Sequence, residues 1–177
     1  MRLVIGLCFI LFALSSCTKN LVPYSGYLQE KHNWGNPEIE QIQFYTSKDI
    51  VLYRNVADSE TQIVNGTVKI ENGKQVEEVV IKAGTPGVAV WQAKDNRYGI
   101  CFETDDERFL TFGVNPEKQK RFYLLASEWN GKNGKVTYNG EKYLTNASSA
   151  DAFLLIDLKK TKNINVRSHT AKGRTVN

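Results

Sequence analysis

KVTYNGEKYL, residues 135–144, is the stretch that decides the fold class. Two runs rich in β-forming residues flank the dipeptide Asn139-Gly140. A type I′ turn needs positive φ at both central residues, and Asn-Gly adopts that conformation readily. The sequence therefore predicts a tight antiparallel hairpin at this point.

The same pattern continues outward along most of the chain. Asn65-Gly66 and Asn72-Gly73 are further hairpin signals, and residues 84–87 and 104–107 are expected to be turns between strands. About ten to twelve short strands at regular spacing predict an all-β fold, mainly an antiparallel barrel or sandwich. Beyond the first hairpin, we expect strands at residues 49–54, 76–81, 88–91, 98–103, 108–112, 121–127, 153–158 and 163–168, with 121–127 and 153–158 as central strands.

One or two short helices are expected before the strands. Ser25 is a candidate N-cap for the first helix, with Leu28 and Trp34 as apolar anchors. The run Asn36-Pro37-Glu38 combines a cap residue, a proline in the first turn and an acid at the positive end of the helix dipole. This second helix is expected to end near Gln41.

The first residues of the chain have the pattern of an export signal. Met1-Arg2 is positively charged, and the apolar run of residues 3–14 is too short for the roughly 20 residues of a membrane-spanning helix. The motif Leu14-Ser15-Ser16-Cys17 resembles the bacterial lipobox. The resemblance implies cleavage before Cys17 and lipid on that cysteine; an ordinary secretory signal with a coincidental cysteine is the alternative.

These patterns divide the chain into four parts. We expect a lipoprotein signal peptide at residues 1–16, a lipidated tether and short helix at 17–35, a single β-rich domain at 36–168, and a basic polar tail at 169–177. The whole chain has a formal net charge of +4, of which Arg2 would leave with the signal. A charge this small does not predict nucleic-acid binding.

The chain also resembles small lipoproteins of Bacteroidota. The resemblance rests on the lipobox, on Leu21-Val22-Pro23-Tyr24, and on residues 42–45 leading into residues 49–53. It implies lipid anchoring in the outer membrane but no particular activity. Surface-exported lipoproteins of that group carry acids soon after the lipidated cysteine, whereas this chain has Thr18-Lys19-Asn20, which favours the periplasmic face.

Cys101 is the candidate nucleophile of the domain. With Cys8 in the signal and Cys17 lipidated, it is the one remaining thiol, so an intramolecular disulfide is not expected. A cysteine-dependent cell-wall enzyme would need a nearby histidine, and His32 and His169 lie near opposite ends of the chain. The alternative is a small buried apolar side chain in a strand.

Metal and cofactor sites are not predicted. Two distant histidines and one cysteine do not match zinc-site spacing, and Asp105-Asp106-Glu107 lacks the spaced ligands of a calcium loop, so it is interpreted as a solvated hairpin tip. The sequence contains no phosphate-binding loop, dinucleotide fingerprint or serine-nucleophile motif.

Two features suggest binding. Trp129 is expected on a loop with residues 130–134, where it could stack on a sugar ring or anchor a protein contact. The C-terminal region carries cations with no acid after Asp157, which suits anionic lipid headgroups, cell-wall carboxylates or an acidic partner, or else a solvated edge strand and tail. The cations are Lys159, Lys160, Lys162, Arg167, Lys172 and Arg174.

We therefore expect a non-catalytic, lipid-anchored binding or scaffolding protein of the cell envelope, as an accessory subunit of an outer-membrane assembly. One alternative is a peptidoglycan- or glycan-binding module, SH3-like around residues 136–144, that uses Trp129 and the cations. The other is the Cys101 enzyme.

Overall fold

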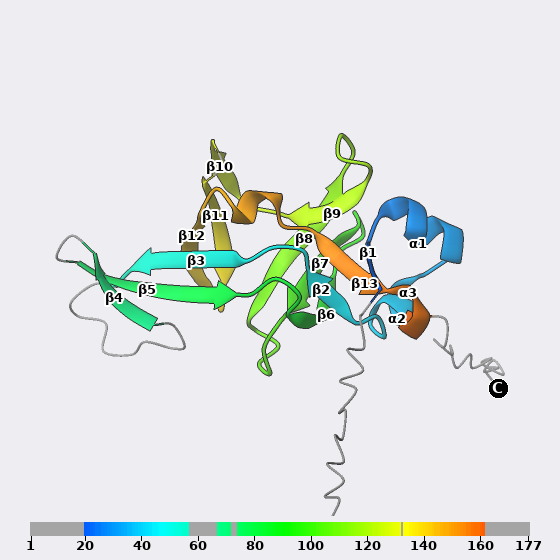
Figure 1. Cartoon of the computed structure of the whole chain (residues 1–177), viewed down its shortest axis with the longest axis horizontal. Coiled ribbons are helices and arrows are strands. Elements are labelled where there is room, and N and C mark those ends of the chain that lie inside the picture. Colours follow the sequence, from blue (N-terminus) through cyan, green and yellow to red (C-terminus); the bar gives the residue numbers. More distant parts are fainter. Residues whose placement is uncertain (1–19, 57–66, 72–73, 132, 162–177) are drawn as a thin grey trace, which may run out of the picture.

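The structure, a computed structural model, describes residues 20–56, 67–71, 74–131 and 133–161. Two antiparallel sheets account for most of these residues, and the described helices are short. The expected all-β fold is confirmed, in a sandwich-like arrangement (Figure 1).

The larger sheet has seven strands and closes on itself. Phe122 N donates to Tyr24 O at 3.3 Å, and Leu124 N donates to Ala152 O at 3.0 Å, so the last strand of the sheet also bonds to segments beside the first two. In spatial order the strands are β1 (Leu21–Pro23), β13 (Leu154–Asp157), β2 (Phe44–Thr46), β6 (Pro86–Gln92), β7 (Arg97–Cys101), β8 (Phe109–Asn115) and β9 (Arg121–Leu124).

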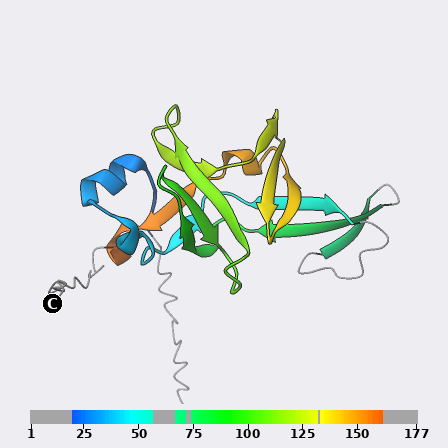
Figure 2. The ribbon, with the colours of Figure 1, turned by 180° about the vertical axis from the view of Figure 1, so that it is seen from behind.

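The second sheet has six strands, and three of them extend away from the closed sheet as an arm (Figures 1 and 2). The expected hairpin is confirmed: Tyr138 lies opposite Glu141, with φ of 52° at Asn139 and 75° at Gly140. The other two Asn-Gly pairs lie outside the described residues. The spatial order is β10 (Glu128–Asn130), β11 (Asn133–Tyr138), β12 (Glu141–Thr145), β3 (Ile50–Asn55), β5 (Lys74–Ile81) and β4 (Thr67–Glu71).

The two expected N-terminal helices are present. Ser25 Oγ accepts from Leu28 N at 3.3 Å at the start of α1 (Gly26–His32). Helix α2 (Asn36–Ile39) is capped by Gly35, rather than by Asn36, and ends two residues earlier than expected. The remaining helical segments are η1 (Ser149–Asp151), a 3-10 turn, and α3 (Leu158–Thr161).

An aromatic cluster ties the N-terminal segment to the core. Tyr24 is fully buried, and its ring centroid lies 4.7 Å from that of Phe122 and 5.1 Å from that of Phe44. Trp34 is also buried, and Leu28 packs against the core. Residues 21–35, expected to lie before the β-rich domain, therefore belong to it, because β1 and Tyr24 complete its sheet and core.

Candidate functional site

A cleft of about 570 Å³ opens between the two sheets. One wall comes from β10, another from the turn between β8 and β9, and a third from η1. Its lining mixes aromatic, aliphatic and charged side chains: Val114, Asn115, Pro116, Glu117, Lys118, Tyr123, Leu124, Leu125, Trp129, Gly131, Ala150 and Asp151.

Trp129 forms one wall of the cleft, and the expectation that it lies on a loop was wrong. It belongs to β10, directly opposite Gly134 of β11, and the turn between the two strands includes Gly131 at φ 60°. The indole fills the space beside Gly134: a Cβ atom there would lie 2.7 Å from Trp129 Cζ3. The side chain is nevertheless 39% exposed, so its ring is held in place but open to a ligand.

The opposite wall is organised by an ion pair. Lys118 Nζ lies 2.9 Å from Asp151 Oδ1 and 4.7 Å from the centroid of the Tyr123 ring. The hydrogen bond to Asp151 raises the pKa of the Lys118 ammonium. This charged pair holds η1 against the β8–β9 turn.

Local hydrogen bonds fix both of these segments. Asn115 Oδ1 accepts from Glu117 N at 3.0 Å and from Lys118 N at 3.2 Å, which shapes the turn after β8. Ser149 Oγ donates to Asn146 Oδ1 at 2.7 Å and accepts from Val51 N at 2.9 Å, which joins η1 to β3. The cleft therefore has walls that are held in place without a ligand.

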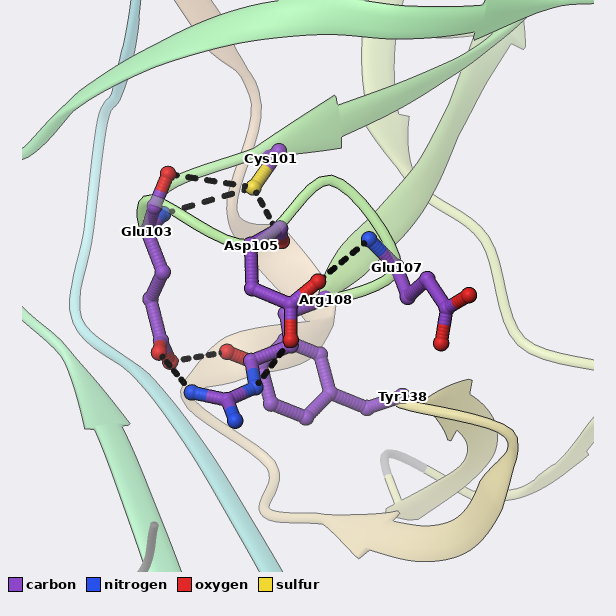
Figure 3. Close-up of polar contacts among 6 residues, drawn as sticks. All are labelled: Cys101, Glu103, Asp105, Glu107, Arg108 and Tyr138. Carbon is purple, nitrogen blue, oxygen red and sulfur yellow. Dashed lines mark hydrogen bonds and ion pairs between the residues drawn. The ribbon is translucent and has the colours of Figure 1, made fainter. Parts of the chain in front are cut away.

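Cys101 lies at a different place, under the turn between β7 and β8 (Figure 3). Its thiol is 1% exposed, and Sγ lies 3.1 Å from Asp105 O and 3.3 Å from Glu103 O. Burial raises the pKa of this thiol. A buried thiol with a raised pKa is the opposite of an activated nucleophile.

The acids around Cys101 are engaged in holding the turn. The Arg108 guanidinium pairs with two acids: Nη1 lies 2.9 Å from Glu103 Oε2, and Nε lies 3.3 Å from Asp105 Oδ2. The Tyr138 hydroxyl also donates to Glu103 (Figure 3). Among the described residues, no group of three or more histidines, cysteines or acids could hold a metal ion. The 104–107 segment is thus a hairpin connection anchored at its base to β11, which the sequence did not indicate.

The other candidate residues and tryptophans within the described ranges do not line the cleft. Lys159 and Lys160 are exposed on α3, which begins at Leu158, the last residue of the strand expected at 153–158. Trp34 is buried and stacks with His32 at 4.6 Å, and Trp91 stacks with Phe109 at 6.3 Å while 41% exposed. Cys17, Lys162, Arg167, His169, Lys172, Arg174 and the strand expected at 163–168 lie outside the described residues.

Three of the predicted binding residues are described by the structure: Trp129 lines the cleft, and Lys159 and Lys160 do not. Tyr123, Lys118 and Asp151 were missed, although the Asn-Pro pair at 115–116 marks a turn in the sequence. No helix of the described part of the chain is long and apolar enough to cross a membrane. Comparisons with protein-family models, curated proteins and solved structures return no match for this chain.

Proposed function

We propose that this protein is a lipid-anchored binding protein of the cell envelope, held on the periplasmic face of the outer membrane through Cys17. In this proposal the cleft is the binding site, and the protein serves as an accessory subunit of an outer-membrane assembly. The observation that carries this proposal is Trp129, a half-exposed indole fixed against Gly134 in the wall of a cleft of ligand-binding size.

The position of the cleft suits such an anchor. Strand β1 begins at Leu21, four residues after Cys17, and four extended residues span at most about 14 Å. The anchored end of the domain would therefore lie close to the bilayer. In Figure 1 the elements that line the cleft, β10, the β8–β9 turn and η1, lie in the upper part of the view, and β1 begins lower down, so these elements are set apart from the point where the chain enters the fold.

The anchor is tested by labelling cells with radioactive palmitate. The wild-type protein is expected to incorporate label and sediment with the outer membrane, whereas Cys17→Ala is expected to do neither. Cys8→Ala is the matched control, since it alters a cysteine of the proposed signal and should keep the label. An unlabelled wild-type protein contradicts the anchor.

The accessory role is tested by extraction in mild detergent followed by affinity purification. We expect a membrane protein to co-purify in a fixed ratio with the wild-type chain. Recovery of a monomer without a partner, under conditions that preserve other outer-membrane complexes, contradicts this part of the proposal.

A further inference from the structure

We infer that the cleft binds an uncharged saccharide of one to three rings, with Trp129 as the stacking platform. The inference deepens the proposed function and rests on it only in taking the cleft as the binding site. A pyranose has an apolar C–H face and a rim of hydroxyl groups. Its site therefore needs a flat aromatic surface with hydrogen-bonding groups beside it.

Two aromatic side chains line the cleft, and Trp129 is the one that offers an open ring. The Trp129 indole packs closely over Gly134: a Cβ on residue 134 would lie 2.7 Å from the indole and 2.8 Å from Ala126 Cβ. The Tyr123 ring is held by two contacts. The Lys118 ammonium lies over it, and the centroid of the Phe153 ring is 5.5 Å from its own. A platform fixed in the free protein loses little side-chain entropy on binding.

The polar groups come from the opposite walls. Glu117 and Asp151 contribute carboxylates, and Lys118 contributes an ammonium group that pairs with Asp151. Carboxylates accept hydrogen bonds from sugar hydroxyls. With two acids and one base, the lining does not have the positive charge that an anionic sugar or phosphate would need.

The size of the cleft agrees with this class of ligand. About 570 Å³ falls within the range of pockets that hold small molecules. The cleft is open to solvent, so it can take a sugar that is part of a longer chain. A flat, wide protein contact would instead need an extended apolar surface, and this lining is interrupted by charges.

The test is saturation-transfer NMR on the full-length protein with chitotriose, maltotriose and 3′-sialyllactose as probes. The protein is kept in lauryldimethylamine oxide, because detergents with sugar headgroups would occupy the site. We expect transfer to ring protons of at least one neutral trisaccharide and none to the sialic acid. Affinity is then measured by calorimetry.

Trp129→Ala is expected to weaken the affinity roughly tenfold or more, as loss of a central aromatic contact does. The matched control is Trp91→Ala, which removes an indole of nearly equal exposure (41% against 39%) outside the cleft. Trp91→Ala should leave the affinity unchanged. Glu117→Gln changes an exposed side chain on the far wall and should weaken trisaccharide affinity severalfold. This variant keeps the test valid if Trp129→Ala fails to fold.

The inference is overturned if neither neutral trisaccharide binds, if the two tryptophan variants behave alike, or if only the anionic sugar binds. A photo-crosslinker at Ala150, on the lip of the cleft, provides the competing outcome: a protein captured there, without sugar binding, makes the cleft a protein contact and also overturns it. Sugar binding does not depend on Cys17. Loss of the palmitate label would therefore remove the anchor and leave this inference standing.

Discussion

Cys101 illustrates how burial decides the chemistry of a residue. Burial raises the pKa of the thiol, and the carboxylates of Asp106, Glu103 and Asp105 add to this effect. The hydrogen bond from Glu103 N to the sulfur acts the other way, but the net shift is upward. These surroundings disfavour the thiolate that nucleophilic catalysis needs. The geometry therefore supports the buried interpretation over the cysteine-enzyme alternative.

We predict that the Cys101 thiol of the native protein reacts with Ellman's reagent at least about a hundredfold more slowly than in urea, because reaction requires local opening. The measurement is thiol release at pH 8 with and without denaturant. Cys101→Ala sets the baseline and shows whether any other thiol contributes. A fast reaction in the native state would instead revive the enzyme hypothesis.

Tyr143 makes a second prediction at the residue scale. The side chain is buried, and burial together with the Glu77 carboxylate raises its pKa from 10.0 to about 12. Between pH 10 and 12 the unfolded chain loses the phenolic proton and the folded chain keeps it. The stabilising contribution is thus complete below pH 10 and is lost as the pH rises toward 12.

Urea unfolding at pH 9, 10, 11 and 12 measures this effect. Tyr143→Phe is the matched control, because all lysines and the other tyrosines still titrate in it. We expect the stability of the wild-type protein to fall more steeply than that of Tyr143→Phe above pH 10. Parallel curves would show that Tyr143 titrates normally in the folded protein.

At the scale of elements, two glycines of one hairpin have different roles: Gly140 lies in the β11–β12 turn, and Gly134 lies in β11. Gly140 has a φ of 75° and open space where a Cβ would be, so Gly140→Ala strains the backbone alone. Gly134→Ala places a methyl group 2.7 Å from the Trp129 ring, which must move. We predict that Gly140→Ala lowers the free energy of unfolding by about 1–2 kcal/mol without affecting the cleft.

Gly134→Ala should instead shift tryptophan emission and weaken trisaccharide binding. Emission is recorded in a Trp91→Phe background, so that the buried Trp34 and the cleft residue Trp129 are the remaining indoles. If both glycine variants change binding to the same degree, Trp129 is not positioned by Gly134.

These elements also show what the sequence could predict. The turn at Asn139-Gly140 was predicted because its conformation depends on the two residues themselves. The strand containing Trp129 was missed because β10 has three residues, all exposed, and so has no alternation of burial to recognise. Helix α3 was not predicted because four residues give no helical period.

At the scale of the whole molecule, closure of the seven-stranded sheet creates the candidate site. Strand β9 bonds to Tyr24 and Ala152, residues about a hundred positions earlier and thirty later in the chain. This closure positions η1 beside the β8–β9 turn, where Asp151 meets Lys118. Pairings between such distant residues leave no local pattern in the sequence. The cleft could therefore not be predicted, although Trp129, one of its lining residues, was identified as a candidate.

Two exposed lysines, Lys159 and Lys160, lie near the proposed anchor. Leu21 pairs with Asp157, and α3 follows directly, so the exposed Lys159 and Lys160 lie beside the point where the chain enters the fold. If Cys17 carries lipid, these lysines are within a short distance of the headgroups. Basic residues next to an anionic surface contribute about 1 kcal/mol each.

We therefore predict that Lys159 and Lys160 are protected from amine acetylation severalfold more in nanodiscs of phosphatidylglycerol than in nanodiscs of phosphatidylcholine. Mass spectrometry of the lipidated protein measures each lysine separately. Lys135 and Lys142, exposed on the six-stranded sheet, are internal controls that should label equally in both lipids. Because the attraction is electrostatic, 1 M salt should abolish the difference. Equal labelling of Lys159 and Lys160 in the two lipids at low salt would show that this face does not meet the membrane, and would leave the cations for a soluble acidic partner.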